Sequence, residues 1–408
     1  MAKKIKDNDK KTKKNIEEEK SLKLVIDTEN FLENMFNIKN FFDINLEFIK
    51  DRKKLKITEL ETFVKTHTKK LNGKKIVAVP IDQDVRFTEM LKDIKIYEHK
   101  PLLSNSAFFI LMNNFEYITK TVIRNLIIEN PKCTIDKKEC PIEFDELFDF
   151  DNISNLKKFI IDKYLEKMFY KSFSEQKKIL LKFFNVNDSD TSLIDFELLN
   201  NATRRRNLLA HNNGIINKTF IQETGADANL LDKKLDITHD YFYKVYNEIL
   251  FFGLYFIILS AIKFKNKFIN IYFMGHLIYN LLKEKAYYVI KKLYESFELR
   301  NNMFCEDVIL DINYFLSLKF MGNKEEMYAK ISKKYTEFKL RDLKDHLRCA
   351  FAVLKDDKKE FLKILPASEF SVKDWYEFPL FNVFREDKVL EKKVLSILKK
   401  KDKKQNKK

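Results

Sequence analysis

Glycine and proline are scarce in this sequence, with only six of each among 408 residues. An all-β fold needs a turn about every 8 to 12 residues, so this scarcity excludes one and favours long helices. Hydrophobic residues make up 45% of the chain and include 38 phenylalanines and 17 tyrosines, enough to bury a large core. We therefore expect a mainly α protein of two or three folding units.

Cysteine and histidine are sparse as well. The four cysteines form no Cys-x-x-Cys pair, which excludes a zinc site of that kind and indicates the reduced thiols of a cytoplasmic protein: Cys133, Cys140, Cys305 and Cys349. No glycine-rich phosphate-binding motif occurs, which excludes a nucleotide-hydrolysing motor in this chain. We expect no metal and no cofactor, since five of the histidines have no metal-ligand spacing: His67, His99, His239, His276 and His346.

Signals for export or membrane insertion are weak. The N-terminal segment has neither the apolar stretch nor the small-residue cleavage site of a secretory signal, which favours a cytoplasmic location. One uncharged run, Ile249 to Ile262, has 14 residues, fewer than the ~20 needed to cross a bilayer. This run predicts a buried core helix, with a membrane span as the alternative, so we expect no membrane partner.

The two ends of the chain are rich in lysine. Residues 1–20 and 399–408 are of low complexity, and we expect them to be disordered and solvated basic tails. Residues 21–100 form a small mixed or helical lead-in. Within it, Asn72-Gly73 is a turn signal, and the apolar run from Ile76 to Ile81 predicts one strand.

Helical periodicity is clear after residue 100. Residues 101–265 predict a bundle of four or five helices, the first starting at Ser104 or Ser106, with Gly214 as a helix stop. Residues 266–398 predict helical hairpins with the lengths of tetratricopeptide-like pairs but no constant period. The segment around Trp375, the only tryptophan, is expected to cap this second region.

Arginine is rare in a chain whose net charge is +16. Only ten arginines occur, and three of them are consecutive, Arg204 to Arg206, in the segment RRRNLLAHNNG. The planar guanidinium holds phosphate with two parallel hydrogen bonds, and a basic chain favours polyanions such as nucleic acid. We therefore expect RNA as a partner, with Arg204 and Arg205 as RNA-binding residues.

A histidine follows the arginine row on the same predicted helix. Asn207 and His211 are four residues apart and share a face, whereas Arg206 lies about 140° from His211 around a regular helix. Imidazole transfers protons near neutral pH, and a guanidinium stabilises charge on a reacting phosphate, so the pair suits attack of an RNA 2′-hydroxyl without a metal. The alternative is a solvated basic patch with a histidine that bonds the last helix carbonyls.

The segment Arg206 to His211 resembles the Arg-x4-6-His motif of the HEPN superfamily, in the form with a polar residue after the arginine. The longer text RRRNLLAHNNGIIN is similar to versions in bacterial anti-phage and abortive-infection proteins. Upstream, FFILMNNFEYITKTVIRNLI resembles the first long helix of these domains, including the step Phe115-Glu116. The resemblance covers roughly residues 101–265.

This resemblance implies a HEPN-like helical bundle that dimerises with two motifs facing one cleft. It implies a metal-independent endoribonuclease that leaves a 2′,3′-cyclic phosphate, acting as the effector of a defence or toxin system with an antitoxin or sensor protein as a further partner. Arg206 then stabilises the transition state, Asn207 positions groups and His211 transfers the proton, with Glu116 as a weaker support. Glu116 is equally a structural partner for Arg204 or Arg205.

A second hypothesis is a non-catalytic helical binding or scaffold protein. In that case the bundle and the C-terminal hairpins recruit a partner, and the arginine row only contacts RNA or an acidic surface. Leu208 and Leu209, beside the motif, are expected to pack either into the bundle or across a two-fold interface.

Overall fold

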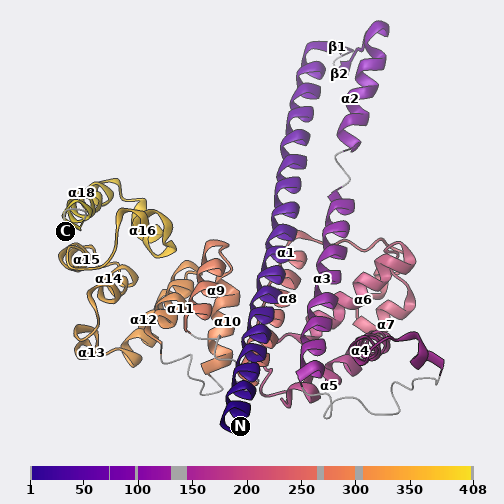
Figure 1. Cartoon of the computed structure of the whole chain (residues 1–408). Helices are drawn as coiled ribbons and strands as arrows, with labels where there is room; N and C mark the ends of the chain where they lie inside the picture. The colour runs from indigo at the N-terminus through magenta and orange to yellow at the C-terminus, as the bar shows by residue number, and fades with distance from the viewer. Residues whose placement is uncertain are drawn as a thin grey trace. The chain divides into compact units, whose positions relative to one another are not determined.

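The structure is a computed structural model that describes residues 2–72, 74–96, 100–129, 145–263, 271–298 and 307–405. Helices hold 79% of the residues and strands 3%, which confirms the mainly α prediction (Figure 1). The chain divides into two compact units. The bundle unit comprises Val25–Phe183 and Asp195–Gly253, and the hairpin unit comprises Met1–Leu24, Phe184–Ile194 and Leu254–Lys408.

The first helix is long. Helix α1 runs from Ala2 to His67, so residues 2–20, which we expected to be disordered, are helical in the structure. At the other end, α18 (Lys388–Gln405) continues through most of the second basic tail. The physical reason is local: no glycine or proline precedes residue 73, and lysine, glutamate and leucine are good helix formers.

A small antiparallel ribbon follows α1. Strands β1 (Thr68–Leu71) and β2 (Lys74–Val77) are joined at Asn72, whose φ of 50° is the left-handed conformation expected of an Asn-Gly turn. The sequence predicted one strand here, and the structure has two. The apolar run ends as a strand at Val77, because Pro80 precedes a short 3-10 helix, η1 (Ile81–Gln83).

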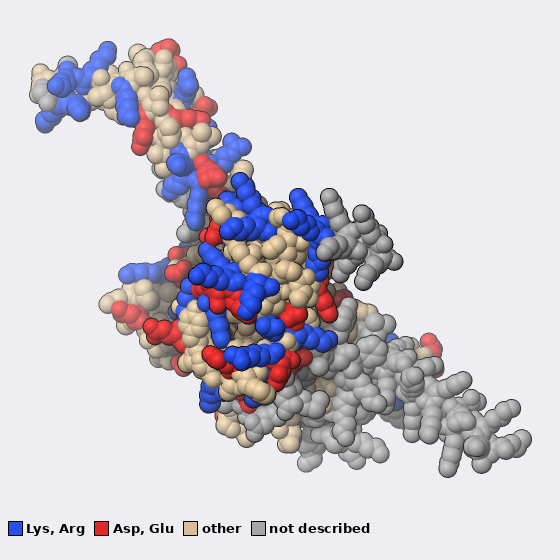
Figure 2. All heavy atoms as spheres, turned by 90° about the vertical axis from the view of Figure 1, so that its left-hand side faces the viewer, with Lys and Arg blue, Asp and Glu red and all other residues tan. Residues whose placement is uncertain are grey.

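The ribbon belongs to an arm formed by residues 56–96. In this arm α2 (Asp84–Ile96) lies beside the end of α1 (Figure 1). The rings of Phe63 and Phe87 stack with centroids 5.5 Å apart, and Lys56 Nζ is 3.2 Å from Asp93 Oδ2. Figure 2 shows lysine and arginine side chains gathered toward the end of the arm.

The bundle itself contains α3 to α8. Helix α3 begins at Lys100, one turn before the predicted caps, because Pro101 is tolerated in a first helical turn, and Ser104 is buried inside the helix. It ends at Glu129, two residues before Pro131 in the sequence. The later elements are η2 (Asp145–Asp149), α4 (Ile153–Phe169), α5 (Phe173–Phe184), α6 (Phe196–Asn212), α7 (Lys218–Thr224), η3 (Ala228–Leu230) and α8 (His239–Lys263).

Helix α1 is part of this bundle rather than a separate lead-in. Phe31 and Phe42 on α1 are fully buried, and the Phe42 and Phe242 ring centroids are 4.1 Å apart. Asn125 on α3 donates to Asp27 on α1 at 3.0 Å. The compact unit accordingly starts at Val25, whereas the sequence suggested a boundary near residue 100.

Helix α8 is strongly apolar and mostly buried. Among the described residues, one helix is long and apolar enough to cross a membrane, His239–Ile262, with a mean hydropathy of 1.8, and 89% of it is buried inside the protein. That burial supports the interpretation of its uncharged run as a core helix. The helix supplies residues to both units, which divide at Gly253 and Leu254 rather than near residue 265.

The hairpin unit contains a series of helices, most of them short. They are α9 (Ile271–Lys283), α10 (Tyr287–Glu298), α11 (Val308–Phe320), α12 (Lys324–Lys334), α13 (Glu337–Arg341), α14 (Asp345–Leu354), α15 (Lys358–Ile364), α16 (Val372–Glu377), η5 (Pro379–Phe381), α17 (Asn382–Arg385) and α18. Trp375 is fully buried and packs against Phe361 and Phe381.

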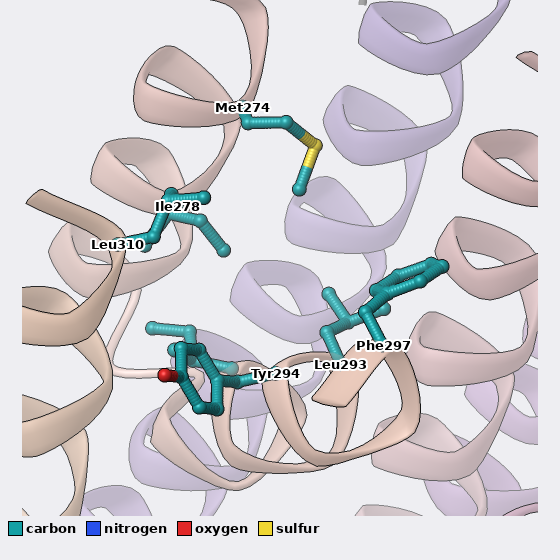
Figure 3. A pocket seen from close by; sticks show the side chains of 7 residues that line it. Met274, Ile278, Leu293, Tyr294, Phe297 and Leu310 are labelled. Carbon is teal, nitrogen blue, oxygen red and sulfur yellow. The ribbon is translucent and has the colours of Figure 1, made fainter. Parts of the chain in front are cut away.

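A narrow apolar hollow lies inside the hairpin unit. Met274 and Ile278 on α9 point toward Leu293 and Phe297 on α10, with Leu310 of α11 beside them (Figure 3). Its volume of about 20 Å³ is room for little more than one water molecule. The hollow is therefore a packing gap of the core rather than a ligand pocket.

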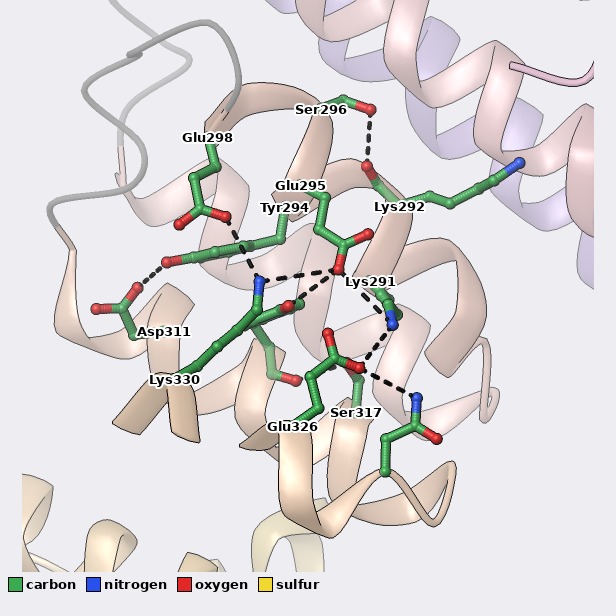
Figure 4. Close-up of polar contacts among 12 residues, drawn as sticks. Lys291, Lys292, Tyr294, Glu295, Ser296, Glu298, Asp311, Ser317, Glu326 and Lys330 are labelled. Carbon is green, nitrogen blue, oxygen red and sulfur yellow. Dashed lines mark hydrogen bonds and ion pairs between the residues drawn. The ribbon is translucent and has the colours of Figure 1, made fainter. Parts of the chain in front are cut away.

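Polar contacts tie the first hairpins of this unit together. Asp311 is fully buried, accepts hydrogen bonds from the hydroxyls of Tyr294 and Tyr335, and pairs with Lys334 Nζ at 2.7 Å. Figure 4 shows Lys330 directed between two carboxylates of α10, Glu295 and Glu298. Every charged member of this cluster has a partner, so we interpret it as structural.

Two helical glycines are expected to respond to alanine in opposite ways. At Gly253 on α8 a Cβ atom would lie 2.4 Å from the buried Phe31 ring, so Gly253→Ala lowers the free energy of unfolding by about 1–3 kcal/mol. At Gly275 on α9 a Cβ atom meets nothing within 4 Å, so Gly275→Ala raises it by about 0.5–1 kcal/mol. Urea unfolding of both variants measures the difference.

Equal effects of the two substitutions would contradict the packing of Phe31 against α8. The double variant Phe31→Leu with Gly253→Ala is the internal control, because a smaller side chain at position 31 leaves room for the new methyl group.

Candidate active site around the arginine row

The start of helix α6 is fixed by a cap and by a tie to α8. Asp195 accepts a hydrogen bond from the backbone N–H of Leu198 at 2.8 Å, as N-cap residues do. The backbone N–H of Asp195 itself donates to the buried carboxylate of Glu248 on α8 at 2.8 Å. Residues 188–191, which precede this cap, form turns, and Thr191 is buried.

The end of α6 is closed by backbone groups. Asn213 and Gly214 adopt positive φ angles of 49° and 74°, and both of their amides donate to the carbonyl of Leu208. This confirms Gly214 as part of the helix stop. Backbone amides thus cap the Leu208 carbonyl, and the described residues show no hydrogen bond from the His211 imidazole to a helix carbonyl.

Arg206 is held between α6 and α3. Its Nη2 atom lies 3.2 Å from Oε1 of Glu116, and its Nη1 atom donates to Oδ1 of Asn207 at 3.1 Å. The side chains of Arg206 and Glu116 are 26% and 33% exposed, so the pair lies at the edge of the bundle and within reach of solvent. The structure thus brings together three of the predicted site residues. Glu116 pairs with Arg206, not with Arg204 or Arg205.

Arg205 is packed on α8. Its guanidinium lies over the Tyr241 ring, 4.2 Å from the centroid, and its Nε donates to Oδ1 of Asn201 at 2.8 Å. The Tyr241 hydroxyl donates to the same Asn201 oxygen at 2.8 Å. Burial raises the pKa of Tyr241 to about 12, against the opposing effect of the Arg205 charge, so the ring stays neutral at physiological pH.

Arg204 points to a third element. Its Nη1 is 3.1 Å from Oε2 of Glu223 on α7, and its Nε is 3.4 Å from Oδ1 of Asn200 one turn earlier. The consecutive arginines therefore reach three different helices, α7, α8 and α3. Arg204 and Arg205, which we expected to bind RNA, both have partners within the bundle unit.

His211 lies apart from these contacts. It is exposed on the last turn of α6, and in the described part of the chain no hydrogen bond or ion pair involves its imidazole. Asn207, one turn earlier, is also exposed. A regular helix separates Arg206 and His211 by about 140°, so one copy of α6 presents the two groups in different directions.

Leu208 and Leu209 pack into the bundle. Their side chains are buried, and a Cβ atom at Gly214 would lie 3.0 Å from Cδ2 of Leu209. This settles the choice that the sequence left open, since neither leucine is available for a two-fold interface.

The metal and thiol predictions concern residues of which only some are described. Within the described ranges, no group of three or more histidine, cysteine, aspartate or glutamate side chains is placed to hold a metal ion. Cys349 is a buried free thiol, and burial raises its pKa to about 12. Cys133, Cys140, Cys305 and His99 lie outside the described residues.

Comparisons with known proteins give no family for this chain. No protein-family model, no curated protein and no solved structure matches it.

Several partners of the arginines escaped the sequence analysis. Asn200 and Asn201 precede Arg204 and Arg205 by four residues, a spacing that places each pair on one helix face. That signal was present in the sequence. Tyr241 lies on another helix, and no local pattern pointed to it.

We expect the arginine row and the histidine to differ in their effect on stability. Arg205→Ala removes the Tyr241 stack and the Asn201 hydrogen bond, and should cost about 1–2 kcal/mol. His211→Ala changes an exposed side chain and should stay within about 0.5 kcal/mol of the parent. Chemical denaturation of both variants measures this. A large loss for His211→Ala would assign that histidine a structural role.

Proposed function

We propose that this protein is a metal-independent endoribonuclease that uses Arg206 and His211. The observation that carries the proposal is the arrangement at the end of α6. Glu116 and Asn207 orient the Arg206 guanidinium at the edge of the bundle, while His211 is exposed on a capped helix end. The resemblance of this segment to the HEPN motif supports the same assignment.

In the proposed reaction the RNA 2′-hydroxyl attacks the adjacent phosphorus. His211 takes the hydroxyl proton, the O2′–P bond forms and the P–O5′ bond breaks, which gives a 2′,3′-cyclic phosphate and a 5′-hydroxyl after proton transfer to the leaving oxygen. Arg206 uses one amino group for Glu116 and one for Asn207, and a guanidinium has five N–H donors, so others are left for a phosphate oxygen.

The proposal includes a two-fold dimer. Because one straight helix directs Arg206 and His211 about 140° apart, a second copy of α6 is needed to bring a histidine and an arginine to one phosphate. By the resemblance to the HEPN motif, the proposed enzyme is a cytoplasmic effector of a bacterial defence or toxin system, with an antitoxin or sensor protein as its regulator.

A non-catalytic binding protein is the second candidate, and one observation favours it. Each arginine of the row has a partner in the same chain, namely Glu223, Tyr241 or Glu116. Under this alternative the row stabilises the bundle, and the helical hairpins recruit a partner.

Incubation of the purified chain with total RNA in excess EDTA should give cleavage, because Arg206 replaces the charge stabilisation that a metal would supply. His211→Ala should lower the rate by about 10²–10⁴-fold, the usual contribution of a general acid or base. His276→Ala is the matched control, since His276 is exposed on α9 and also has an asparagine four residues away, Asn280.

Analysis of the cleaved ends checks the mechanism. Cyclic phosphate ends support it. Loss of cleavage on chelation, with recovery on adding a divalent ion, would contradict it. Cleavage that is unchanged in His211→Ala would point to a contaminating nuclease.

Activity per chain should fall as the protein is diluted through its dissociation range, because the proposed site needs two copies of α6. Specific activity and sedimentation velocity, measured over the same concentrations, test this. Constant turnover per chain in a monomer would reject the composite site but leave the ribonuclease assignment standing.

A further inference from the structure

The ribbon at the end of the arm carries a concentration of lysines without partners. Five lysines occur between Lys65 and Lys75, and no acidic residue lies between Glu61 and Asp82. All five side chains are exposed, and among the described residues none of these side chains takes part in a hydrogen bond or ion pair: Lys65, Lys69, Lys70, Lys74 and Lys75. The arginine row has partners, whereas this charge is uncompensated.

The register of the strands places lysine on both faces of the ribbon. Lys70 lies opposite Lys75 and therefore on the same face. Lys69 lies opposite Ile76, and Lys74 shares this second face by alternation. Like charges placed directly opposite each other destabilise a strand pair by about 0.2–1 kcal/mol, a cost that bound phosphate would remove.

Aromatic stacking and a backbone hydrogen bond hold the ribbon on α1 and α2. His67 stacks on the buried Phe63 ring with centroids 4.1 Å apart, and Phe63 stacks in turn on Phe87 of α2. The backbone N–H of Ala78 donates to the carbonyl of His67 at 2.9 Å. The aromatic rings of this part of the arm are used in its own packing, so the ribbon offers charge rather than a platform for stacking bases.

We propose that the β1–β2 ribbon binds RNA through its phosphate groups and so holds it on the unit that also carries α6. Charge complementarity identifies the occupant as a polyanion. Lysines on both faces suit a ribbon that lies between two lines of phosphates, as in a groove of folded RNA. The choice of RNA over DNA rests on the proposed ribonuclease function.

A membrane is the other polyanionic surface to consider for this arm, because Ile81 and Val85 near the ribbon are 96% and 68% exposed. Surface-bound membrane elements separate a charged face from an apolar face. The ribbon does not, since Ile76 shares a face with Lys69 and Val77 shares a face with Lys70. This mixing favours RNA.

The test is a binding titration in the His211→Ala background, so that a labelled RNA stem-loop stays intact. The arm variant K69Q/K70Q/K74Q/K75Q should bind at least about tenfold more weakly, with a slope of log Kd against log salt reduced by about 3. The matched control is K392Q/K393Q/K399Q/K400Q, which neutralises four exposed lysines of α18 and should leave both quantities unchanged.

Three results would overturn the proposal. They are an arm variant that binds like the α18 control, tighter binding of the same-sequence DNA hairpin than of the RNA, and tighter binding of vesicles rich in phosphatidylserine. Circular dichroism of the arm variant confirms that the helices are intact. Binding needs no catalysis, so the two proposals can fail separately. If the protein cuts no RNA but the arm variant loses RNA affinity, the ribonuclease proposal is wrong and the RNA-binding ribbon stands. If the protein cuts RNA and the arm variant keeps its affinity, the ribbon proposal is wrong and the ribonuclease stands.

Discussion

Burial of α8 is the constraint on which the bundle unit depends. Its apolar face buries Phe242 against Phe42 of α1, and Gly253 allows the Phe31 ring to approach the α8 backbone. Two polar groups of α8 attach α6 to it. Glu248 holds the first amide of α6, and Tyr241 carries the guanidinium of Arg205. A displacement of α8 would therefore move α6.

The contacts of the three consecutive arginines follow from that arrangement. Consecutive positions on a helix point about 100° apart, so Arg204, Arg205 and Arg206 reach α7, α8 and α3 in turn. This fixes the rotation of α6 and leaves Asn207 and His211 on an exposed face. The same contacts that stabilise the helix thus orient the one guanidinium that we assign to catalysis, which is how a structural and a catalytic role coexist in one motif.

Local patterns predicted much of the fold. The mainly helical class, the buried helix α8, the turn at Asn72 and the stop at Gly214 were predictable because each depends on composition or on residues adjacent in the sequence. The features that the sequence did not predict depend on contacts between residues far apart in the chain. Asp195 is the cap of α6, and its amide bonds Glu248 on a distant helix. Helix α1 belongs to the bundle because it buries its phenylalanines on α8. Within the site, Glu116 lies 90 positions before Arg206, so spacing alone left its partner open.

Charge was harder to interpret from the sequence. Rare arginines suggested the RNA contact, and abundant lysines suggested solvation. The structure gives the arginines partners and leaves the ribbon lysines without any in the described residues, because side-chain pairing depends on the register of two strands and on the stacking beneath them. Catalysis and capture of RNA are therefore assigned to different parts of one unit.

Histidine footprinting tests the central claim, that RNA occupies the exposed end of α6. Diethyl pyrocarbonate modifies exposed imidazoles, and peptide mass spectrometry reads each site in the presence of an RNA whose 2′-hydroxyls are methylated, so that it binds without cleavage. The account predicts that this RNA slows modification of His211 and leaves the exposed His276 on α9 unaffected. Unchanged modification of His211 at saturating RNA would contradict it.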